Sequence, residues 1–130
     1  MSNPVAQQAH SKFKIFTGKL EADLSLGKLS GEVEAFAKSS KAAAKSIGVE
    51  YLEASSTLVV TLGYRDDEAG YPIKLQAVKL GIAEKLDAAD LARLEKKMEE
   101  EASKLTGVIC HELFVTEKRE FLMVLMTAAT

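Results

Sequence analysis

Apolar and polar residues alternate near the start of the chain. Phe13 and Ile15 stand between lysines, and every second residue of the segment 20–26 is apolar. A period of two is typical of a half-buried strand, so we expect a hairpin that turns at residues 17–18. The second arm has an alternative interpretation, as irregular chain that leads into the first helix.

A helical period follows. Apolar residues recur at helical spacing, Ser30 is a candidate N-cap, and Glu32 and Glu34 place negative charge at the positive end of the helix dipole. Gly48 stands where a left-handed residue would end the helix. We therefore predict a helix over residues 31–47.

A second helical stripe is the clearest in the chain. Asp87 and Asp90 stand three residues apart at its start and can cap it, and Gly107 follows its last apolar residue. The stripe consists of Leu91, Leu94, Met98, Ala102 and Leu105. The pattern predicts a helix that begins after Asp87 and ends before Gly107.

The other apolar segments have the composition of β-strands and are separated by polar turns. Strands are predicted over residues 49–54, 57–65, 71–82, 108–116 and 120–127. In the third of these the apolar positions change phase, which predicts a bulge near residues 76–78. The last two strands are expected to form a closing hairpin.

These elements predict an α+β fold in the order ββ-α-βββ-α-ββ, with two helices packed on one face of a mainly antiparallel sheet as two layers. Residues 1–11 are predicted to be a flexible tail and residues 12–130 a single domain. Four identities at an offset of 59 positions, among them Gly48 with Gly107, raise the hypothesis of a duplicated αββ unit. Independent use of a common element order is the alternative.

Two of the predicted strands carry nearly unbroken apolar runs, Leu58–Leu62 and Phe121–Met126. A helix with one apolar stripe covers one side of a sheet, so the other side needs cover as well. The N-terminal hairpin or a second chain can supply that cover. The second possibility predicts a homodimer.

The composition is that of a folded globular chain, with 47% hydrophobic and 28% charged residues and a net charge of -2. A balanced charge argues against a nucleic-acid partner, which a basic surface would attract. The first residues lack the pattern of a secretory signal, and no stretch reaches the roughly 18–20 apolar residues of a membrane span. The single cysteine forms no disulfide within the chain. We expect a cytoplasmic protein with no membrane partner.

Cys110, His111 and Glu112 bring a thiol, an imidazole and a carboxylate together in sequence. In a strand the first and third side chains point to one face and the second to the other, so they do not converge on one metal ion. We predict that Cys110 is buried and structural, and we assign no catalytic residue, metal or cofactor. An enzyme that uses carboxylates or a tyrosine stays an alternative.

Tyr64, Arg65 and Tyr71 flank the polar turn 66–70. Aromatic rings beside an arginine form a common recognition surface, so these three residues are the candidate contact with a partner or ligand. The alternative is a tyrosine pair that supports the tip of a hairpin. The acidic residues of the turn are consecutive and lack the alternating ligand positions of a calcium loop.

The apolar runs favour a non-catalytic binding or accessory protein, chaperone-like or an adaptor, that acts as a homodimer. The element order is similar to that of small acidic secretion chaperones, an analogy of architecture without a shared motif. The alternative is a small-molecule-binding protein or small enzyme with a pocket between sheet and helices, where Met98 and Met123 would line the cavity.

Overall fold

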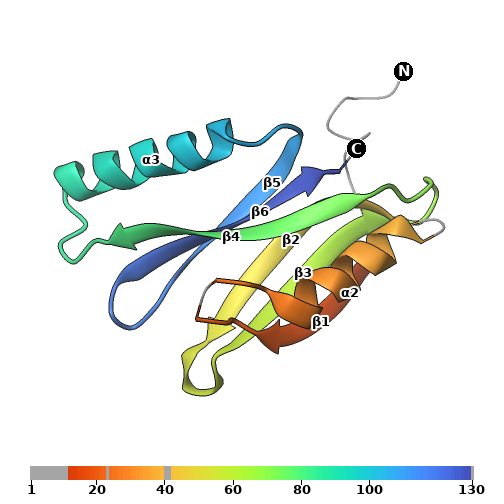
Figure 1. The fold of residues 1–130 in the computed structure, drawn as a ribbon, viewed down its shortest axis with the longest axis horizontal. Helices are drawn as coiled ribbons and strands as arrows, with labels where there is room; N and C mark the ends of the chain where they lie inside the picture. Colours follow the sequence, from red (N-terminus) through yellow and green to blue (C-terminus); the bar gives the residue numbers. More distant parts are fainter. Residues whose placement is uncertain (1–11, 23, 40–41, 130) are drawn as a thin grey trace.

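The computed structural model describes residues 12–22, 24–39 and 42–129, so the predicted tail lies outside the described residues. The elements of the described chain (Figure 1) are β1 (Lys12–Lys19), α2 (Gly27–Lys38), β2 (Ala43–Leu52), η1 (Glu53–Ser55), β3 (Thr57–Arg65), β4 (Ile73–Ile82), α3 (Ala88–Ser103), β5 (Val108–Val115) and β6 (Glu120–Ala128). The predicted α+β class is confirmed, with the helices packed on antiparallel sheets.

The strands form two antiparallel sheets of three strands each, a division that was not predicted. Sheet A has the order β1-β3-β2, and sheet B has the order β4-β6-β5. Strands β2 and β5 lie side by side where the sheets meet, without forming a ladder in the described chain. At this seam the rings of Tyr51 and Phe114 lie 5.6 Å apart, and the Glu117 N–H donates to Glu53 Oε2 at 2.6 Å.

Strand β6 is apolar on both faces because the chain itself covers both. Leu122 and Val124 belong to the main core with α2 and sheet A, whereas Met123 and Leu125 belong to a second core beneath α3. Figure 1 shows the two helices on opposite sides of sheet B. Every residue of the run 121–126 is buried. A second chain is therefore not needed to cover this strand.

Helix α2 packs against the outer strands of both sheets, β1 and β4. Its buried residues, Leu29, Val33 and Ala37, follow helical spacing along one face. Two glycines permit the close approach. A Cβ on Gly18 would lie 2.7 Å from the Cβ of Leu29, and one on Gly70 would collide with backbone carbonyl oxygens at the end of α2.

The start of the chain follows the alternative interpretation. Strand β1 ends at Lys19, and the described residues of 20–26 lead into α2 without forming a strand. The helix begins at Gly27, which lies in the left-handed region with φ 51°. The Gly27 N–H donates to Ser25 Oγ at 3.1 Å. Ser30 lies inside the helix and donates to the Gly27 carbonyl, so its prediction as the N-cap was wrong.

The C-terminal half of the predicted helix 31–47 is also wrong. Helix α2 ends at Lys38, and the chain from Ala43 onward is strand β2. Ala44 and Ile47 are buried in the strand, paired with β3. Their spacing of three suits a helix, but a bulge between Ala44 and Ser46 turns both side chains to the core of the sheet. Pairing with β3 overrides the helix propensity of the alanine-rich segment.

Two smaller predictions are corrected. The bulge in β4 lies between Lys79 and Gly81, not near residues 76–78. The duplication fails at its proposed offset, because Gly48 lies inside strand β2 whereas Gly107 lies in the loop before β5 with φ 71°. The shared residues therefore do not occupy equivalent structural positions.

Helix α3 is capped as predicted. Asp87 is the N-cap, and its Oδ1 accepts the Asp90 N–H at 2.9 Å. The helix packs on sheet B near β4, and Leu94 is its one buried residue. Leu91, one turn earlier, is 47% exposed. Along its apolar stripe, α3 is therefore anchored mainly at Leu94.

Candidate functional site

The structure gives both tyrosines of the predicted contact surface internal partners. The ring of Tyr64 packs edge-on against Phe36, with centroids 5.1 Å apart. The Tyr71 hydroxyl donates to the Ala44 carbonyl oxygen, and burial raises the pKa of this phenol. Both rings hold neighbouring elements in place, and a role in contacting a partner stays a prediction.

Arg65, the third residue of this set, turns toward the acidic residues of its own loop. Its Nη2 lies 2.6 Å from Asp67 Oδ2, and nearby Lys45 Nζ lies 3.0 Å from Glu68 Oε2. Ion pairs at the surface add little to stability, but they engage carboxylates that a cation would need. Ion pairs with Arg65 and Lys45 therefore hold this loop, and its consecutive acidic residues do not form a cation-binding site.

The side chains of the segment 110–112 diverge, as predicted. Cys110 is half-buried, not fully buried as predicted, and it lies against β2. Burial raises the pKa of its thiol to about 11, and a backbone hydrogen bond with Ile47 offsets this only in part. Glu112 lies beside Gly48 of the same strand, while His111 lines a hollow under α3. Among the described residues no cluster of His, Cys, Asp and Glu could hold a metal ion.

We expect Cys110 to react slowly with a disulfide reagent in the native protein and rapidly once urea has unfolded it. The raised pKa leaves about two orders of magnitude less thiolate at neutral pH, and partial burial shields part of what remains. Because the chain has one cysteine, absorbance of the released reagent reports this thiol alone. Native and denatured rates within a few-fold of each other would contradict the structural role.

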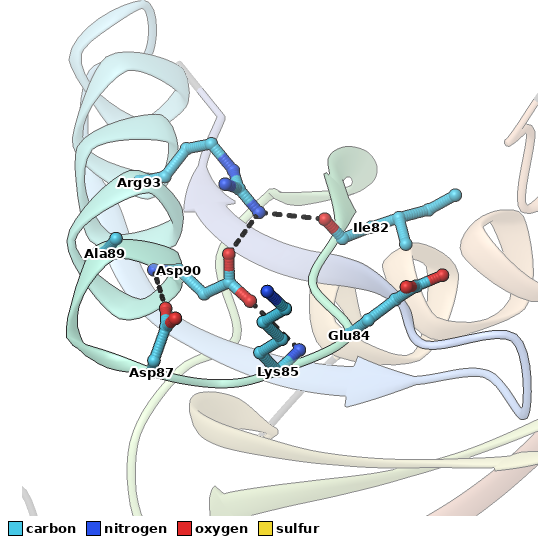
Figure 2. A pocket seen from close by; sticks show the side chains of 7 residues that line it. All are labelled: Ile82, Glu84, Lys85, Asp87, Ala89, Asp90 and Arg93. Atoms are coloured by element: carbon cyan, nitrogen blue, oxygen red, sulfur yellow. Dashed lines mark hydrogen bonds and ion pairs between the residues drawn. The ribbon is translucent and has the colours of Figure 1, made fainter.

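A hollow of ≈ 370 Å³ lies at the N-terminal end of α3 (Figure 2), where acidic side chains engage the backbone donors. Asp90 Oδ2 accepts the N–H groups of Lys85 and Leu86 at 3.1 and 3.0 Å. Removal from solvent alone would raise the pKa of this carboxyl, but the two N–H groups and Arg93 outweigh it and lower that pKa. An anionic ligand would have to displace these carboxylates.

The basic group at this hollow is also engaged. Figure 2 shows Arg93 directed toward Asp90 and the Ile82 carbonyl, at 2.9 and 3.0 Å. These contacts tie the first turn of α3 to the end of β4. The hollow is a capping structure, and its polar groups do not converge on an empty position.

The outer face of sheet A is the first surface that no described helix covers, although Glu112 of β5 reaches its β2 edge beside Gly48. Residues that pair directly share a face, so Ile15, Thr61 and Gly48 form one row across β1, β3 and β2. Ile15 is 65% exposed, and Leu52 on the same face is 50% exposed. Sequence patterning missed this face because a conventional sheet turns charged residues outward.

A second hollow, of ≈ 190 Å³, lies between α3 and sheet B. It is lined by Met98, Glu99, Ala102, Val108, His111, Met123 and Leu125. Methionine side chains adapt to irregular apolar partners, and both methionines of the predicted pocket line this hollow. The hollow forms because α3 is anchored at Leu94 and leaves the space beneath its later turns unfilled.

The chain matches no protein-family model, no curated protein and no solved structure. Within the described residues, no helix is long and apolar enough to cross a membrane.

Proposed function

We propose that this chain is a non-catalytic binding or accessory protein, chaperone-like or an adaptor, that acts in the cytoplasm as a homodimer. The observation that carries the proposal is the outer face of sheet A. Its centre holds Ile15, Val59, Thr61 and Gly48, all uncharged, and the carboxylate of Glu112 from β5 reaches the face only at the β2 edge, beside Gly48. Loss of charge at the centre of a surface is the compositional mark of a protein interface.

A second copy can lie on this face with its strands in the same register. A two-fold axis parallel to β3 places β1 of one copy over β2 of the other and keeps the position along the strands. Ile15 and Gly48 lie at the same level, paired with the same residue of β3. The projecting isoleucine of each copy therefore meets Gly48 of the other copy, where β2 has no side chain but Glu112 Oε1 of β5 lies 3.9 Å from the position of a Cβ.

The charges at the margins of the face also suit a second copy. Lys19 ends β1 at one edge of the sheet, and Glu50 lies on β2 at the other edge. The same two-fold axis brings each lysine near the glutamate of the second copy. Complementary charges at the rim of an interface favour association and fix its orientation.

The area of the outer face of sheet A sets the expected affinity of the dimer. Three strands about 4.8 Å apart, with eight residues at about 3.4 Å each, give roughly 400 Å² in projection. The side chains that project from the sheet add to this area. The interface then approaches the lower end of the size range of stable complexes, which average roughly 800 Å² per partner. We expect a dimer that dissociates in the micromolar range.

Replacement of Ile15 by lysine should weaken association by about tenfold or more, because a charge would be buried in each half of the interface. Sedimentation velocity over a micromolar concentration series measures the effect. Leu91→Lys is the matched control, since Leu91 is exposed on α3, far from this face in the fold. Both variants should keep the far-UV circular dichroism of the parent.

A parent chain that stays monomeric throughout the series would contradict the homodimer. A chain shortened by residues 1–11 serves as the second arm of the experiment. If only the shortened chain dimerises, the N-terminal segment covers the face, and the homodimer proposal fails for the full chain.

The second candidate function is a small-molecule-binding protein or small enzyme. The hollow that contains Met98 and Met123 favours it, because its volume is similar to that of apolar cavities that bind benzene, about 150 Å³. Native mass spectrometry of the purified protein tests it. A bound small molecule would favour this function, and a ligand-free dimer would favour the first.

A further inference from the structure

The face of β5 that points to the α3 side of sheet B is largely uncovered. His111, Leu113 and Val115 pair with β6 residues of the second core, so they share the face on which α3 lies. Leu113 is 42% and Val115 is 47% exposed. Helix α3 packs near β4 at the other edge of the sheet, which leaves this strip open.

Two hollows mark the ends of this strip. The Met98 hollow of ≈ 190 Å³ includes His111, and a larger hollow of ≈ 540 Å³ includes Val115 together with Leu52 of β2. His111 and Val115 are four positions apart on the strand, about 14 Å. An α-helix rises about 1.5 Å per residue, so side chains eight positions apart on one helix lie about 12 Å apart.

The charged residues that line the two hollows are all acidic. Glu99 lines the first, and Glu53 and Glu117 line the second. Neither lining contains lysine or arginine. Glu99 has no ion pair among the described residues. A partner with basic residues beside its apolar ones would complement both ends of the strip.

We infer that the β5 strip binds an amphipathic helix of a partner protein, with apolar residues at positions i, i+4 and i+8 flanked by lysine or arginine. The first apolar residue enters the Met98 hollow, the second covers Leu113, and the third reaches the hollow at Val115. This mode of recognition lays an apolar helix face in a groove. The inference rests on the proposed binding function and names the class of partner.

Other occupants fit less of the strip. A small molecule in the Met98 hollow would leave Leu113 and Val115 exposed. An added strand would need the free edge of β5, which lies beside β2. A helix covers the whole strip without either difficulty.

The probe is a phage-displayed library of 16-residue helical peptides, with leucine or methionine fixed at i, i+4 and i+8 and the flanking positions random. We expect the enriched peptides to be basic at these flanks. Fluorescence anisotropy then measures the affinity of the most enriched peptide for the full chain and its variants. Failure to enrich any peptide, or enrichment of acidic flanks, would overturn the inference.

Matched variants locate the peptide. Ala102→Leu fills the Met98 hollow and should weaken binding about tenfold, whereas Ala92→Leu, exposed on the same helix, should leave it unchanged. Glu99→Lys should weaken binding by a similar factor, with Glu100→Lys as its control because Glu100 does not line the hollow. Equal effects of a variant and its control would place the peptide elsewhere and refute the site.

The experiment separates this inference from the homodimer proposal. Ile15→Lys lies on the outer face of sheet A, so it should change sedimentation. Because Leu52 belongs to that face and also lines the hollow at Val115, peptide affinity is compared at protein concentrations where both chains are monomeric, and it should be unchanged there. Peptide binding by a chain that never dimerises would support the β5 site and contradict the homodimer. A dimer that binds no peptide would give the opposite result. Binding of a small molecule alone at Met98 would overturn the helix as the occupant.

Discussion

Val124→Asp should destabilise the protein by about 3–5 kcal/mol, as an unpaired charge does in a core. Val124 is completely buried in the main core, between Ala77 of β4 and Glu112 of β5. The new carboxylate is too short to reach water, and its nearest charged neighbour on the sheet is another acid. Urea unfolding followed by circular dichroism measures the loss. Since burial raises the pKa of such a carboxyl, the loss should be smaller in mildly acidic buffer.

Val115→Asp is the matched control for this prediction. The residue type and the sheet are the same, but Val115 is 47% exposed, so the loss should be about 1 kcal/mol or less. A different result would be informative. If Val124→Asp produced a folded monomer of unaltered stability, β6 would be covered by a second chain and not by α2 and sheet A.

The parts of the fold that depend on local chemistry were predictable from the sequence. Asp87 caps α3 through its own side chain, and Gly107 adopts the left-handed conformation after the helix. The hairpin of β5 and β6 begins and ends within a residue of the prediction. In each case the signal and the structure it specifies lie within a few residues of one another.

The end of α2 could not be predicted in this way. The alanine-rich segment before Ile47 favours a helix locally, and the spacing of Ala44 and Ile47 fits a strand only because of the bulge between Ala44 and Ser46. Its state is decided by pairing with β3, where Ile47 lies opposite Leu62. Because β3 follows this segment in the sequence, the segment itself contains no signal of the pairing.

The sequence also indicated that β6 needs cover on both faces, but not what supplies the cover. Leu122 and Val124 are covered by α2 and sheet A, and Met123 by α3. That arrangement follows from the division into two sheets. The division depends on how β2 and β5 meet, a tertiary contact that periodicity does not encode.

The candidate surfaces show the same limit. A pocket beside Met98 and Met123 was predictable, because an apolar helix stripe has to face an apolar strand. The exposed residues Leu113 and Val115 were missed, although the β5 sequence is apolar in both phases. Their exposure depends on α3 lying toward β4, which only the structure shows.

Leu94→Ala should cost about 2–5 kcal/mol, the usual loss for a large buried side chain cut back to alanine. Leu94 is the one buried residue of α3 and packs in the second core with Leu80, Phe121 and Met123. Leu91→Ala makes the same change one turn earlier on the same helix, at an exposed position, and should cost less than about 1 kcal/mol. Urea unfolding compares the two variants, and equal losses would show that the phase of α3 is wrong.

The part of the molecule that Leu94→Ala destabilises tests whether Leu94 is the main anchor of α3. With Leu94 removed, α3 should detach before the sheets unfold, because little else holds its apolar stripe. Amide hydrogen exchange should then rise across α3 while the amides of β3 stay protected, as expected for local opening. Uniform loss of protection in both elements would mean that α3 unfolds together with the rest of the chain. The space beneath its later turns would then be part of one cooperative core, and not a site that opens to admit a partner.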